Sequence, residues 1–358
     1  MWIKNIKLSN FRNYSFQDIK LNQNANIFFG ENAQGKTNVI ESIFLCSIGK
    51  SFRAKRDSEM IKIDSKEAVL EIEYEKKDRE GKIKIVLSDK KNIFLNDIKI
   101  KKISELLGKI NIVIFTPDDI EILKGGPQNR RRFLDIMISQ LRPNYLYNLN
   151  LYMQVLEQRN NYLRQIKLEN KPEKLLEIWD EKLADYAQKI ASYRNEFIKK
   201  IKQKIIKIHS EITDDKEEIK LEYKTECLEK EKYLETLKDR RKLDIIRGYT
   251  TQGIHRDDFE IYLNNKEIQI YGSQGQHRTA ILSLKLSELQ IICDEIGENP
   301  ILLLDDFMSE LDEKRREKLL KNIKNTQVII TCTEKIEIDD LKCCLYNVNQ
   351  GNVIEIKE

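Results

Sequence analysis

The chain has 358 residues, of which 40% are hydrophobic and 34% charged, and its formal net charge is +4. This length suits two domains or one large domain with an insertion, and the mildly basic charge permits nucleic acid as a partner without requiring it. No segment approaches the ~20 apolar residues of a membrane span. Six scattered cysteines without a CxxC pair, and three histidines, argue against a zinc site. The opening MWIKNIKLSNF alternates like a strand and lacks the apolar core of a signal peptide, so we expect a cytoplasmic protein with no membrane partner.

Strands dominate the predicted structure of the first ~125 residues, because short apolar runs there alternate with polar residues. In SDKKNIFLNDIKI, the pair Asn96–Asp97 lies between two apolar pairs and predicts a hairpin turn. The other strand candidates in this part are WIKNIKLSNF, NANIFF, AVLEIEY, GKIKIVL and INIVIF.

The middle of the chain, residues 129–247, contains no glycine and is predicted to be helical. Its apolar residues recur every three or four positions along a long helix, namely Leu175, Ile178, Trp179, Leu183, Tyr186, Ile190, Tyr193, Phe197, Ile201, Ile205 and Ile208. Bulky aromatic residues on this face favour packing against other helices over the alternative, a coiled-coil arm.

Strand character returns after Gly248. FEIYLNNKEIQIY predicts a second hairpin with Asn264–Asn265 at its tip, an apolar helix is expected from about Gln276, and NPILLLDDF and QVIITCTE read as buried strands. We therefore expect an α/β fold formed by both ends of the chain, residues 1–128 and 248–358, with a mostly helical subdomain, residues 129–247, inserted between them.

The octapeptide GENAQGKT fits the phosphate-binding loop pattern GxxxxGK[ST] without a mismatch, after a short apolar strand and before a helix-compatible stretch. Its glycines let backbone N–H groups surround a phosphate at a helix N-terminus. Lys36 is predicted to reach the β- and γ-phosphates, and the Thr37 hydroxyl to bind Mg²⁺. The predicted ATP-binding residues are Gly30, Glu31, Asn32, Ala33, Gln34, Gly35, Lys36, Thr37 and Asn38.

The buried strand ILLL ends in two carboxylates that complement this loop. Asp305 would hold Mg²⁺ directly or through water, and Asp306 would act as the general base on the attacking water. Roughly 270 residues separate the loop from this strand, which is more than a compact nucleotide-binding core needs and agrees with the inserted helical part.

The hexapeptide YGSQGQ, at residues 271–276, precedes a helix and so forms a second anion site. One nucleotide rarely needs two cradles from one protomer, but two protomers facing head to tail would use both. YGSQGQ resembles the signature motif of the ATP-binding-cassette superfamily, and Ser309–Asp312 resembles its D-loop. Ser273, Gln274, Gly275 and Gln276 would then act on the partner's nucleotide, with Ser309 and Asp312 in the D-loop. The sequence departs from that pattern where Thr333 replaces a switch histidine and VIFTPDD lacks a glutamine.

Further stretches narrow this resemblance, namely LSNFRNY, the run from Pro117 through Gly125 to Asp135, and GIHRDD at residues 253–258. Together with GENAQGKT and YGSQGQ they resemble the RecF family of bacterial DNA replication and repair proteins, almost from end to end. The resemblance implies an ATPase head like that of SMC proteins, without long coiled-coil arms. It also implies an ATP-dependent homodimer that binds duplex, gapped and junction DNA. With RecO and RecR it would load RecA onto single strands, and weak, DNA-stimulated hydrolysis would release it.

Several residues keep two interpretations. Arg12 would touch the nucleotide near its α-phosphate or base, or be a surface arginine. His255–Asp258 would cap a strand through internal ion pairs, or lie at the edge of a dimer or nucleotide. Arg130–Arg132 would face phosphate, or form a solvated helix face or internal ion pairs. The alternative functions are the ATPase subunit of a membrane transporter and a nucleotide-gated clamp without useful hydrolysis, whereas an SMC-like condensing protein would need arms that this length excludes.

Overall fold

The computed structural model describes residues 1–77, 79–323, 325–335 and 343–356, and it divides into two compact units. The P-loop unit comprises Met1–Ile120 and Arg278–Glu358, and the helical unit comprises Glu121–His277. The sequence-based boundaries lie after residues 128 and 247, whereas residues 248–277 belong here to the helical unit. The reason is that strand β10 (Asp258–Leu263) pairs in antiparallel register with β9 (Ile219–Lys224).

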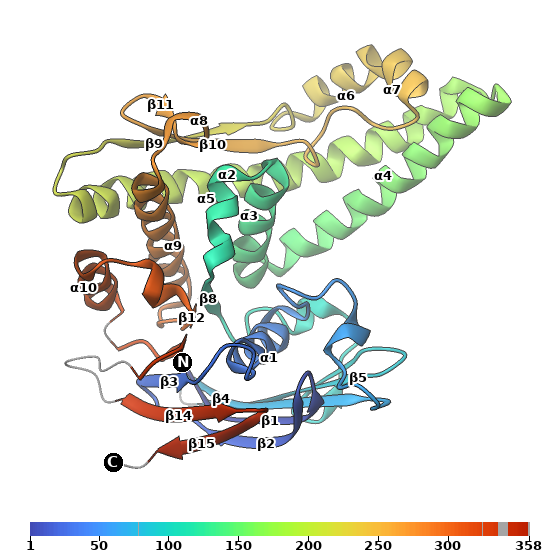
Figure 1. Ribbon diagram of the computed structural model, residues 1–358. Helices are drawn as coiled ribbons and strands as arrows, with labels where there is room; N and C mark the ends of the chain where they lie inside the picture. The colour runs from blue at the N-terminus through green and yellow to red at the C-terminus, as the bar shows by residue number, and fades with distance from the viewer. Residues whose placement is uncertain (78, 324, 336–342, 357–358) are drawn as a thin grey trace. The chain divides into compact units, whose positions relative to one another are not determined.

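Two sheets build the described part of the P-loop unit (Figure 1). The first is antiparallel, in the order β2-β1-β4-β5-β6-β7. Asn96 and Asp97 both have positive φ between β6 and β7, which confirms the predicted hairpin turn. The strands are β1 (Trp2–Phe11), β2 (Tyr14–Lys20), β4 (Ala68–Lys76), β5 (Arg79–Leu87), β6 (Asn92–Leu95) and β7 (Ile98–Lys99).

The second sheet has the order β15-β14-β3-β13-β12-β8, in which β14, β3, β13, β12 and β8 are parallel and β15 is antiparallel to β14. β12 and β13 are buried throughout, as their continuous apolar runs predict. The strands are β3 (Ala25–Phe29), β8 (Ile112–Phe115), β12 (Ile301–Asp305), β13 (Val328–Cys332), β14 (Cys343–Asn349) and β15 (Asn352–Ile356).

Helices complete the P-loop unit. Helix α1 follows β3 after a six-residue loop, residues 30–35, and lies over the strands of this unit in Figure 1. The helices are α1 (Lys36–Ile48), α9 (Gln274–Ile296) from Arg278 onward, α10 (Glu313–Asn322) and the 3₁₀ turns η1 (Asp57–Met60), η2 (Ile103–Glu105), η3 (Pro117–Ile120) and η5 (Phe307–Glu310).

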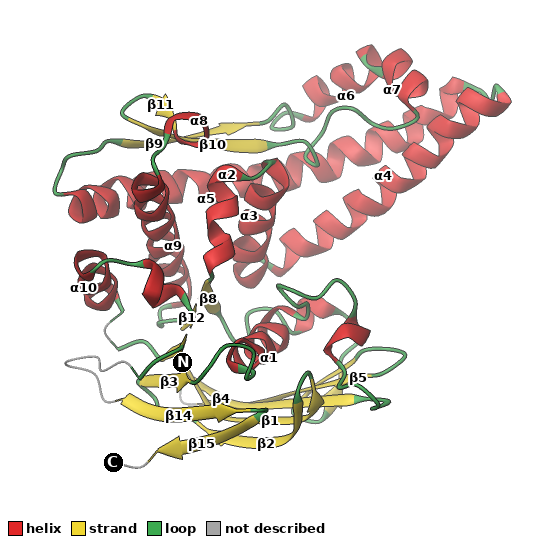
Figure 2. Ribbon diagram, in the orientation of Figure 1, coloured by secondary structure: helices red, strands yellow, loops and turns green. Residues whose placement is uncertain are grey.

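The helical unit is organised around two long helices, α4 (Pro143–Glu169) and α5 (Leu176–Thr213), which run side by side in Figure 2. α5 confirms the long helix predicted from the apolar spacing. It also contacts α3, α6 and β9, so it is a packed helix and not a coiled-coil arm. The other elements are α2 (Glu121–Lys124), α3 (Pro127–Leu141), η4 (Glu173–Leu175), α6 (Lys230–Asp239), α7 (Arg241–Arg247), α8 (Ile268–Tyr271) and the first turn of α9 (Gln274–Ile296).

The second predicted hairpin is right at its turn and wrong in part of its return strand. Asn264 and Asn265 have positive φ, as a two-residue hairpin turn requires. The return strand β11 covers Lys266–Glu267 only, and IQIY, which alternates like a strand, forms helix α8 instead. Its Ile268 is buried while Ile270 and Tyr271 are exposed, so tertiary packing overrides the local pattern.

Buried charges hold the helical unit together. Arg159 on α4 is fully buried and forms ion pairs of 2.7 Å with Asp180 on α5 and with Asp244 on α7. Because each buried charge has a partner, removing one partner would leave an uncompensated charge in the core.

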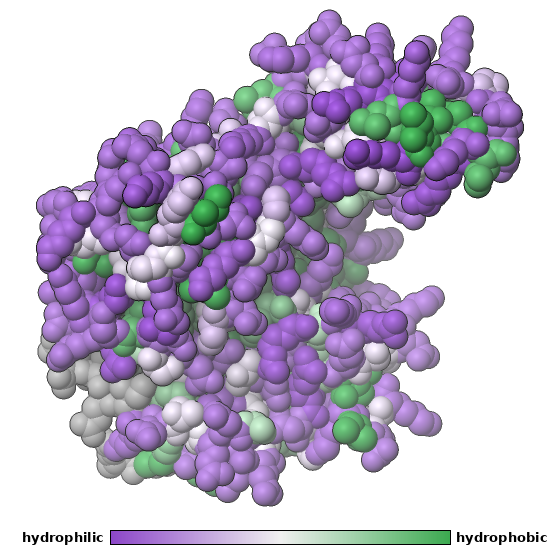
Figure 3. Space-filling model, turned by 45° about the horizontal axis from the view of Figure 1, so that its top comes forward, coloured by the Kyte–Doolittle hydropathy of each residue, from purple (hydrophilic) through white to green (hydrophobic). Residues whose placement is uncertain are grey.

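The surface is mostly hydrophilic on the face drawn in Figure 3, with an apolar group near the end of the α4–α5 hairpin. Leu168, Ile178 and Ile246 are among the exposed apolar residues of that region. Among the described residues, no helix combines the length and the apolar character that crossing a bilayer requires.

Candidate nucleotide site

The loop between β3 and α1 depends on two glycines with positive φ. At Gly30, with φ of 148°, an added Cβ would lie 2.4 Å from the carbonyl oxygen of Val348. At Gly35, with φ of 119°, it would lie 2.6 Å from Nδ2 of Asn13. Gly35 is also the N-cap of α1, and no side chain caps the helix there, so the first backbone N–H groups of α1 remain available to an anion.

The side chain of Lys36 connects two parts of the phosphate loop. Its ammonium group donates hydrogen bonds of 2.8 Å to the carbonyl oxygens of Gly30 and Glu31. The residue is almost completely buried, although it is charged. A buried ammonium group needs such acceptors, so these two carbonyl groups hold Lys36 across the mouth of the loop.

Thr37 and Asp305 connect the loop to the acidic strand. The Thr37 hydroxyl donates a hydrogen bond of 2.8 Å to Oδ1 of Asp305. Thr331, at the end of the intervening strand β13, donates a second bond of 2.8 Å to the same oxygen. The three side chains meet because β3, β13 and β12 are parallel and end at the same edge of the sheet.

Burial raises the pKa of the Asp305 carboxyl group above its ordinary value, because the charged form loses contact with water. The hydrogen bonds from Thr331 and Thr37 oppose that shift in pKa, because they stabilise the carboxylate form. A hydroxyl and a carboxylate oxygen side by side match the hard oxygen ligands that Mg²⁺ requires.

Asp306 leaves the strand in an unusual backbone conformation. Its φ of 49° lies in the left-handed region, and its N–H donates a 3.0 Å hydrogen bond to the Thr331 hydroxyl. Strained residues of this kind persist where the surrounding structure fixes them. Asp306 lines the same pocket as Lys36 and Thr37, and its role as general base stays a prediction.

These residues line a pocket of about 680 Å³. Its lining comprises Arg12, Asn13, Asn32, Ala33, Gly35, Lys36, Thr37, Asn38, Arg53, Glu59, Ile61, Lys62, Ile63 and Asp306. The pocket therefore brings six of the predicted loop residues together with Arg12 and Asp306. Asp305 is not among the residues that line the pocket, but it is hydrogen-bonded to Thr37, which is. That volume falls within the range of small-molecule sites.

Arg12 lines this pocket but is held by the protein. Its guanidinium donates to both carboxylate oxygens of Glu41, at 2.8 and 2.7 Å, and to the carbonyl oxygen of Glu59 at 2.7 Å. Glu41 is fully buried on α1, so this ion pair connects the end of β1 to the loop helix. The paired guanidinium is therefore more than a surface arginine, and its contact with a nucleotide stays a prediction.

Asn13 and Tyr14 support the loop, a role that sequence reasoning missed. Asn13 Nδ2 donates to the carbonyl oxygen of Gln34 at 2.7 Å, and the Tyr14 hydroxyl donates to that of Gly35 at 2.9 Å. Asn38, in turn, donates to Oδ1 of Asn13 at 2.9 Å. The only signal in the sequence is the stretch LSNFRNY, which contains both residues.

The predicted signature residues belong to the helical unit, just before Arg278, where α9 continues into the P-loop unit. Ser273 and Gln276 form a reciprocal pair at the start of α9. The Ser273 hydroxyl accepts from the Gln276 N–H at 3.2 Å, and Gln276 Oε1 accepts from the Ser273 N–H at 2.9 Å. This is the geometry of a capping box, which shows that a helix N-terminus does begin at the motif, at Gln274.

The predicted D-loop and switch residues belong to the P-loop unit. The Ser309 hydroxyl donates to the Asp306 carbonyl at 2.7 Å, and Asp312 caps α10 by accepting from the Arg315 N–H at 2.9 Å. Thr333 follows β13 and is exposed. In VIFTPDD, the Thr116 N–H donates to Asp119 Oδ2 at 2.7 Å.

Residues of two motifs with open interpretations contact one another inside the helical unit. Arg130 forms a bidentate pair with Asp258, at 2.7 and 2.9 Å, and Arg131 donates to the Asp257 carbonyl at 2.6 Å. Asp257 itself accepts from Tyr223 at 2.6 Å. These contacts agree with the internal ion-pair interpretation of both motifs, and a role of either motif at a nucleotide or dimer edge stays a prediction.

Comparison with known proteins gives one consistent result. The family model for the RecF/RecN/SMC N-terminal domain matches residues 2–352. A protein of Acetivibrio thermocellus described as DNA replication and repair protein RecF is 44% identical over 346 residues, which cover 94% of both chains. The protein of the same description from Clostridium acetobutylicum is 43% identical and covers 99% of this chain and 100% of its own.

Comparison with solved structures points to the same family. A structure described as the recombination mediator protein RecF bound to ATP in the RecFOR pathway superposes with a TM-score of 0.94, at 39% identity, over 99% of this chain and 98% of its own. The Smc head domain of Pyrococcus furiosus superposes with a TM-score of 0.59 at 17% identity, over 99% of this chain and 96% of its own, and shows a shared fold alone.

Proposed function

The chain belongs to the RecF/RecN/SMC N-terminal domain family and, within it, to the RecF proteins of DNA replication and repair, and on that premise we propose that it is an ATP-dependent DNA-binding protein of recombinational repair. One observation carries this proposal. The phosphate loop and the acidic strand meet through the hydrogen bond between Thr37 and Asp305, beside a pocket that Lys36 also lines.

ATP is the proposed ligand of this pocket. The related RecF structure is described with ATP, and the available N–H groups of α1 suit a phosphate chain. Lys36 would exchange the carbonyl oxygens of Gly30 and Glu31 for phosphate oxygens. Thr37 and Asp305 would hold Mg²⁺, which when bound neutralises charge on the phosphates. Asp306 would accept a proton from the attacking water.

Ligand-gated dimerisation is the second part of the proposal. Ser273, Gly275 and Gln276 present a helix N-terminus in a unit other than the one that holds the phosphate loop. In a head-to-tail dimer, each copy would offer this N-terminus to the γ-phosphate held by the other. Weak hydrolysis would then open the dimer and release DNA.

DNA, RecO and RecR are the proposed partners, with RecA loading on single strands as the outcome. The related structure is assigned to the RecFOR pathway. Among the described residues, the segment of the P-loop unit between α1 and β4 contains six cations without an ion-pair partner, namely Lys50, Arg53, Lys55, Arg56, Lys62 and Lys66. Three lysines on the first sheet, Lys4, Lys7 and Lys82, are instead paired with glutamates of a neighbouring strand. Unpaired cations favour a polyanion.

The alternative function, the ATPase subunit of a membrane transporter, has less support, because the sequence match to RecF proteins covers almost the whole chain. A role on chromosomal DNA also supports the cytoplasmic location that the sequence predicts.

The test is DNA binding by fluorescence anisotropy, on single-stranded, duplex and gapped substrates, with and without ATP. We expect ATP to strengthen binding to duplex and gapped DNA. A double variant, Lys55→Glu with Lys66→Glu, should weaken this binding and flatten its salt dependence, whereas Lys99→Glu, an exposed lysine on β7, should have little effect. Binding that ignores ATP on every substrate would contradict the proposal.

A further inference from the structure

The side-chain amide of Gln276, at the end of the predicted signature motif, is hydrogen-bonded at both of its ends. Its Oε1 accepts the Ser273 N–H at 2.9 Å, and its Nε2 donates a 2.9 Å hydrogen bond to Oε1 of Glu217. A backbone N–H can only donate and a carboxylate can only accept. These two neighbours therefore determine which end of the amide faces which, and a single orientation of the amide satisfies both.

Glu217 itself is held in place on the loop between α5 and β9. The next residue, Glu218, exchanges two hydrogen bonds of 2.9 Å with Asn264 in the turn after β10. The second carboxylate oxygen of Glu217, Oε2, lies 3.4 Å from Nε2 of His209, which is fully buried on α5. The carboxylate that accepts from Gln276 therefore has a defined position in the single chain.

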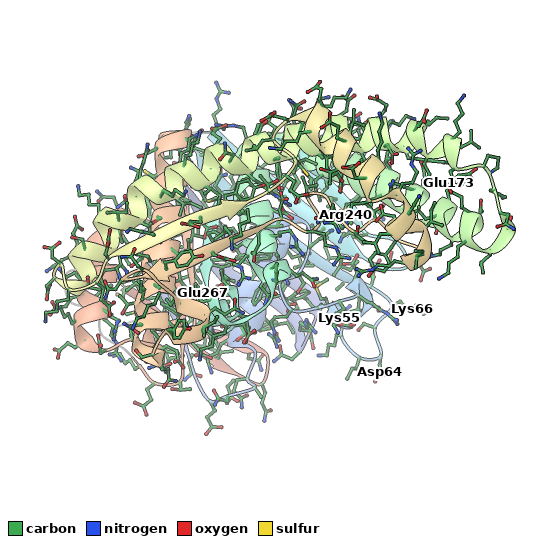
Figure 4. The ribbon with its side chains drawn as sticks, turned by 90° about the horizontal axis from the view of Figure 1, so that it is seen from above. Lys55, Asp64, Lys66, Glu173, Arg240 and Glu267 are labelled. Carbon is green, nitrogen blue, oxygen red and sulfur yellow. The ribbon has the colours of Figure 1, made fainter. Side chains whose placement is uncertain are left out.

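The contact between Glu217 and Gln276 joins residues that are 59 positions apart but belong to the helical unit. Helix α5 contacts β9, and β9 pairs with β10. Glu267, labelled in Figure 4, ends β11 and leads through α8 to Ser273. The position of the signature motif relative to Glu217 is therefore set by the fold of this unit.

The orientation of the Gln276 amide determines which donor Ser273 can offer to a ligand. The Ser273 N–H is already bonded to Oε1 of Gln276, and the Ser273 hydroxyl accepts the Gln276 N–H at 3.2 Å. A hydroxyl group that accepts one hydrogen bond can still donate its own proton in another. Because Ser273 is exposed, this hydroxyl proton is the Ser273 donor that an incoming phosphate can reach.

We propose that Glu217 is a positioning residue for the signature motif. By fixing the amide of Gln276, it holds the Ser273 hydroxyl ready to donate to the γ-phosphate bound by the partner protomer. Without an acceptor at residue 217, the amide could rotate and place its NH₂ group against the Ser273 N–H, so that two donors would face each other. The reciprocal cap would then open, and the hydroxyl would lose its orientation. This inference rests on the proposed ATP-dependent dimer and deepens it.

Glu217→Met tests this role, because methionine has a similar length but only a weak acceptor. The measurement is light scattering with ATP and Mg²⁺ over a range of protein concentrations. The dimer of this variant should dissociate at roughly tenfold higher protein concentration or more, the effect of losing one hydrogen bond to a charged group. Glu217→Gln keeps a carbonyl oxygen that can accept from Gln276, and should dimerise within about threefold of the wild type.

A double-variant cycle tests whether Glu217 acts through Gln276. Gln276→Met removes the amide and leaves the loop between α5 and β9 unchanged. It should weaken the dimer as much as Glu217→Met does, and the variant with both substitutions should be no weaker than either one alone. A residue that merely stabilised its own loop would instead add its loss to that of Gln276→Met.

The matched control is Glu218→Met, the same substitution at the exposed neighbour, whose side chain pairs with Lys220. It should dimerise as the wild type does. Every variant should bind ATP as a monomer with wild-type affinity, because the phosphate loop lies in the other unit.

Three results would overturn the positioning role of Glu217. One is a dimer of wild-type strength in Glu217→Met. Another is an equal loss in Glu217→Met and Glu217→Gln, which would show that the acceptor is not what matters. The third is a double variant whose loss is the product of the two single losses. Wild-type protein that binds ATP and stays a monomer would contradict the proposed dimer itself, and this inference with it.

Discussion

The Thr37 hydroxyl donates a 2.8 Å hydrogen bond to Asp305, a residue 268 positions away in the chain. This pair joins the phosphate loop to the acidic strand, and both groups suit Mg²⁺. We predict that Asp305→Asn removes the gain in ATP affinity that Mg²⁺ provides, because an amide is a weaker ligand than a carboxylate. Losing or reorienting one ligand of a metal site typically costs about 10- to 100-fold in metal affinity. ATP titrations with Mg²⁺ and with a chelator measure the effect.

The control for this substitution is Asp89→Asn, which makes the same change at an exposed position between β5 and β6. It should keep the wild-type response to Mg²⁺. An Asp305→Asn protein that responds to Mg²⁺ as the wild type does would contradict the assignment of Asp305 as a ligand.

A substitution at Asp306 should distinguish ATP binding from ATP hydrolysis. As a general base it would accept a proton in the transition state without contributing to ground-state binding. We expect Asp306→Asn to keep ATP affinity and to lose turnover by about 100-fold or more, the typical contribution of a positioned base. Phosphate release under single-turnover conditions measures this. Turnover within twofold of wild type would exclude Asp306 as the base.

Variants at Ser273 test the proposed head-to-tail dimer. It caps α9, so replacing it with alanine or arginine would also cost helix stability of about 1 kcal/mol. Asp and Asn both cap helices well and differ by one charge. We therefore predict that Ser273→Asp abolishes the ATP-dependent dimer in light scattering, because its carboxylate would face the partner's γ-phosphate.

Ser273→Asn is the matched control and should still form the dimer. If the Asp and Asn variants dimerise equally well with ATP, no phosphate lies against this residue. ATP binding by the monomer should be the same in both, since the phosphate loop lies in the other unit.

His255 gives the helical unit a predicted pH dependence. Its Nε2 lies 3.1 Å from the Thr250 carbonyl oxygen, which can only accept, and its Nδ1 lies 2.8 Å from the Tyr152 hydroxyl. The Thr250 carbonyl oxygen can only accept, so Nε2 has a proton. Burial lowers the pKa of His255 from 6.5 to about 4.

The lowered pKa means that the unfolded chain binds the proton more tightly than the folded protein does. The stabilising contribution is present above pH 6.5 and is lost as the pH falls from 6.5 to 4. The loss is on the order of 3 kcal/mol at most. Urea unfolding at pH 7.5 and pH 5 should show a smaller loss in His255→Gln than in the wild type. Parallel losses in both proteins would contradict it.

The sequence predicts the parts of the site whose residue types are dictated by local geometry. Gly30 and Gly35 must be glycine because a Cβ would collide with the backbone of Val348 or the side chain of Asn13. Asn96–Asp97 and Asn264–Asn265 mark their turns because few other residues accept positive φ. The buried strand before Asp305 follows from its unbroken apolar run.

The parts that sequence reasoning missed depend on contacts between distant segments. Nothing local shows that Tyr14 reaches Gly35 or that Arg12 reaches Glu41. In IQIY, an alternating pattern favours a strand, but the segment forms a helix in which Ile268 is buried.

The most direct test of the account compares DNA affinity with and without ATP in wild-type protein and in Lys36→Arg, alongside Lys50→Arg at an exposed position. Lys36 lies buried across the loop, where the larger guanidinium cannot take its place. The account predicts that ATP strengthens DNA binding in the wild type and in Lys50→Arg, and that Lys36→Arg loses this response while keeping its ATP-free DNA affinity. An ATP response of wild-type size in Lys36→Arg would contradict the claim that nucleotide bound at this loop controls DNA binding.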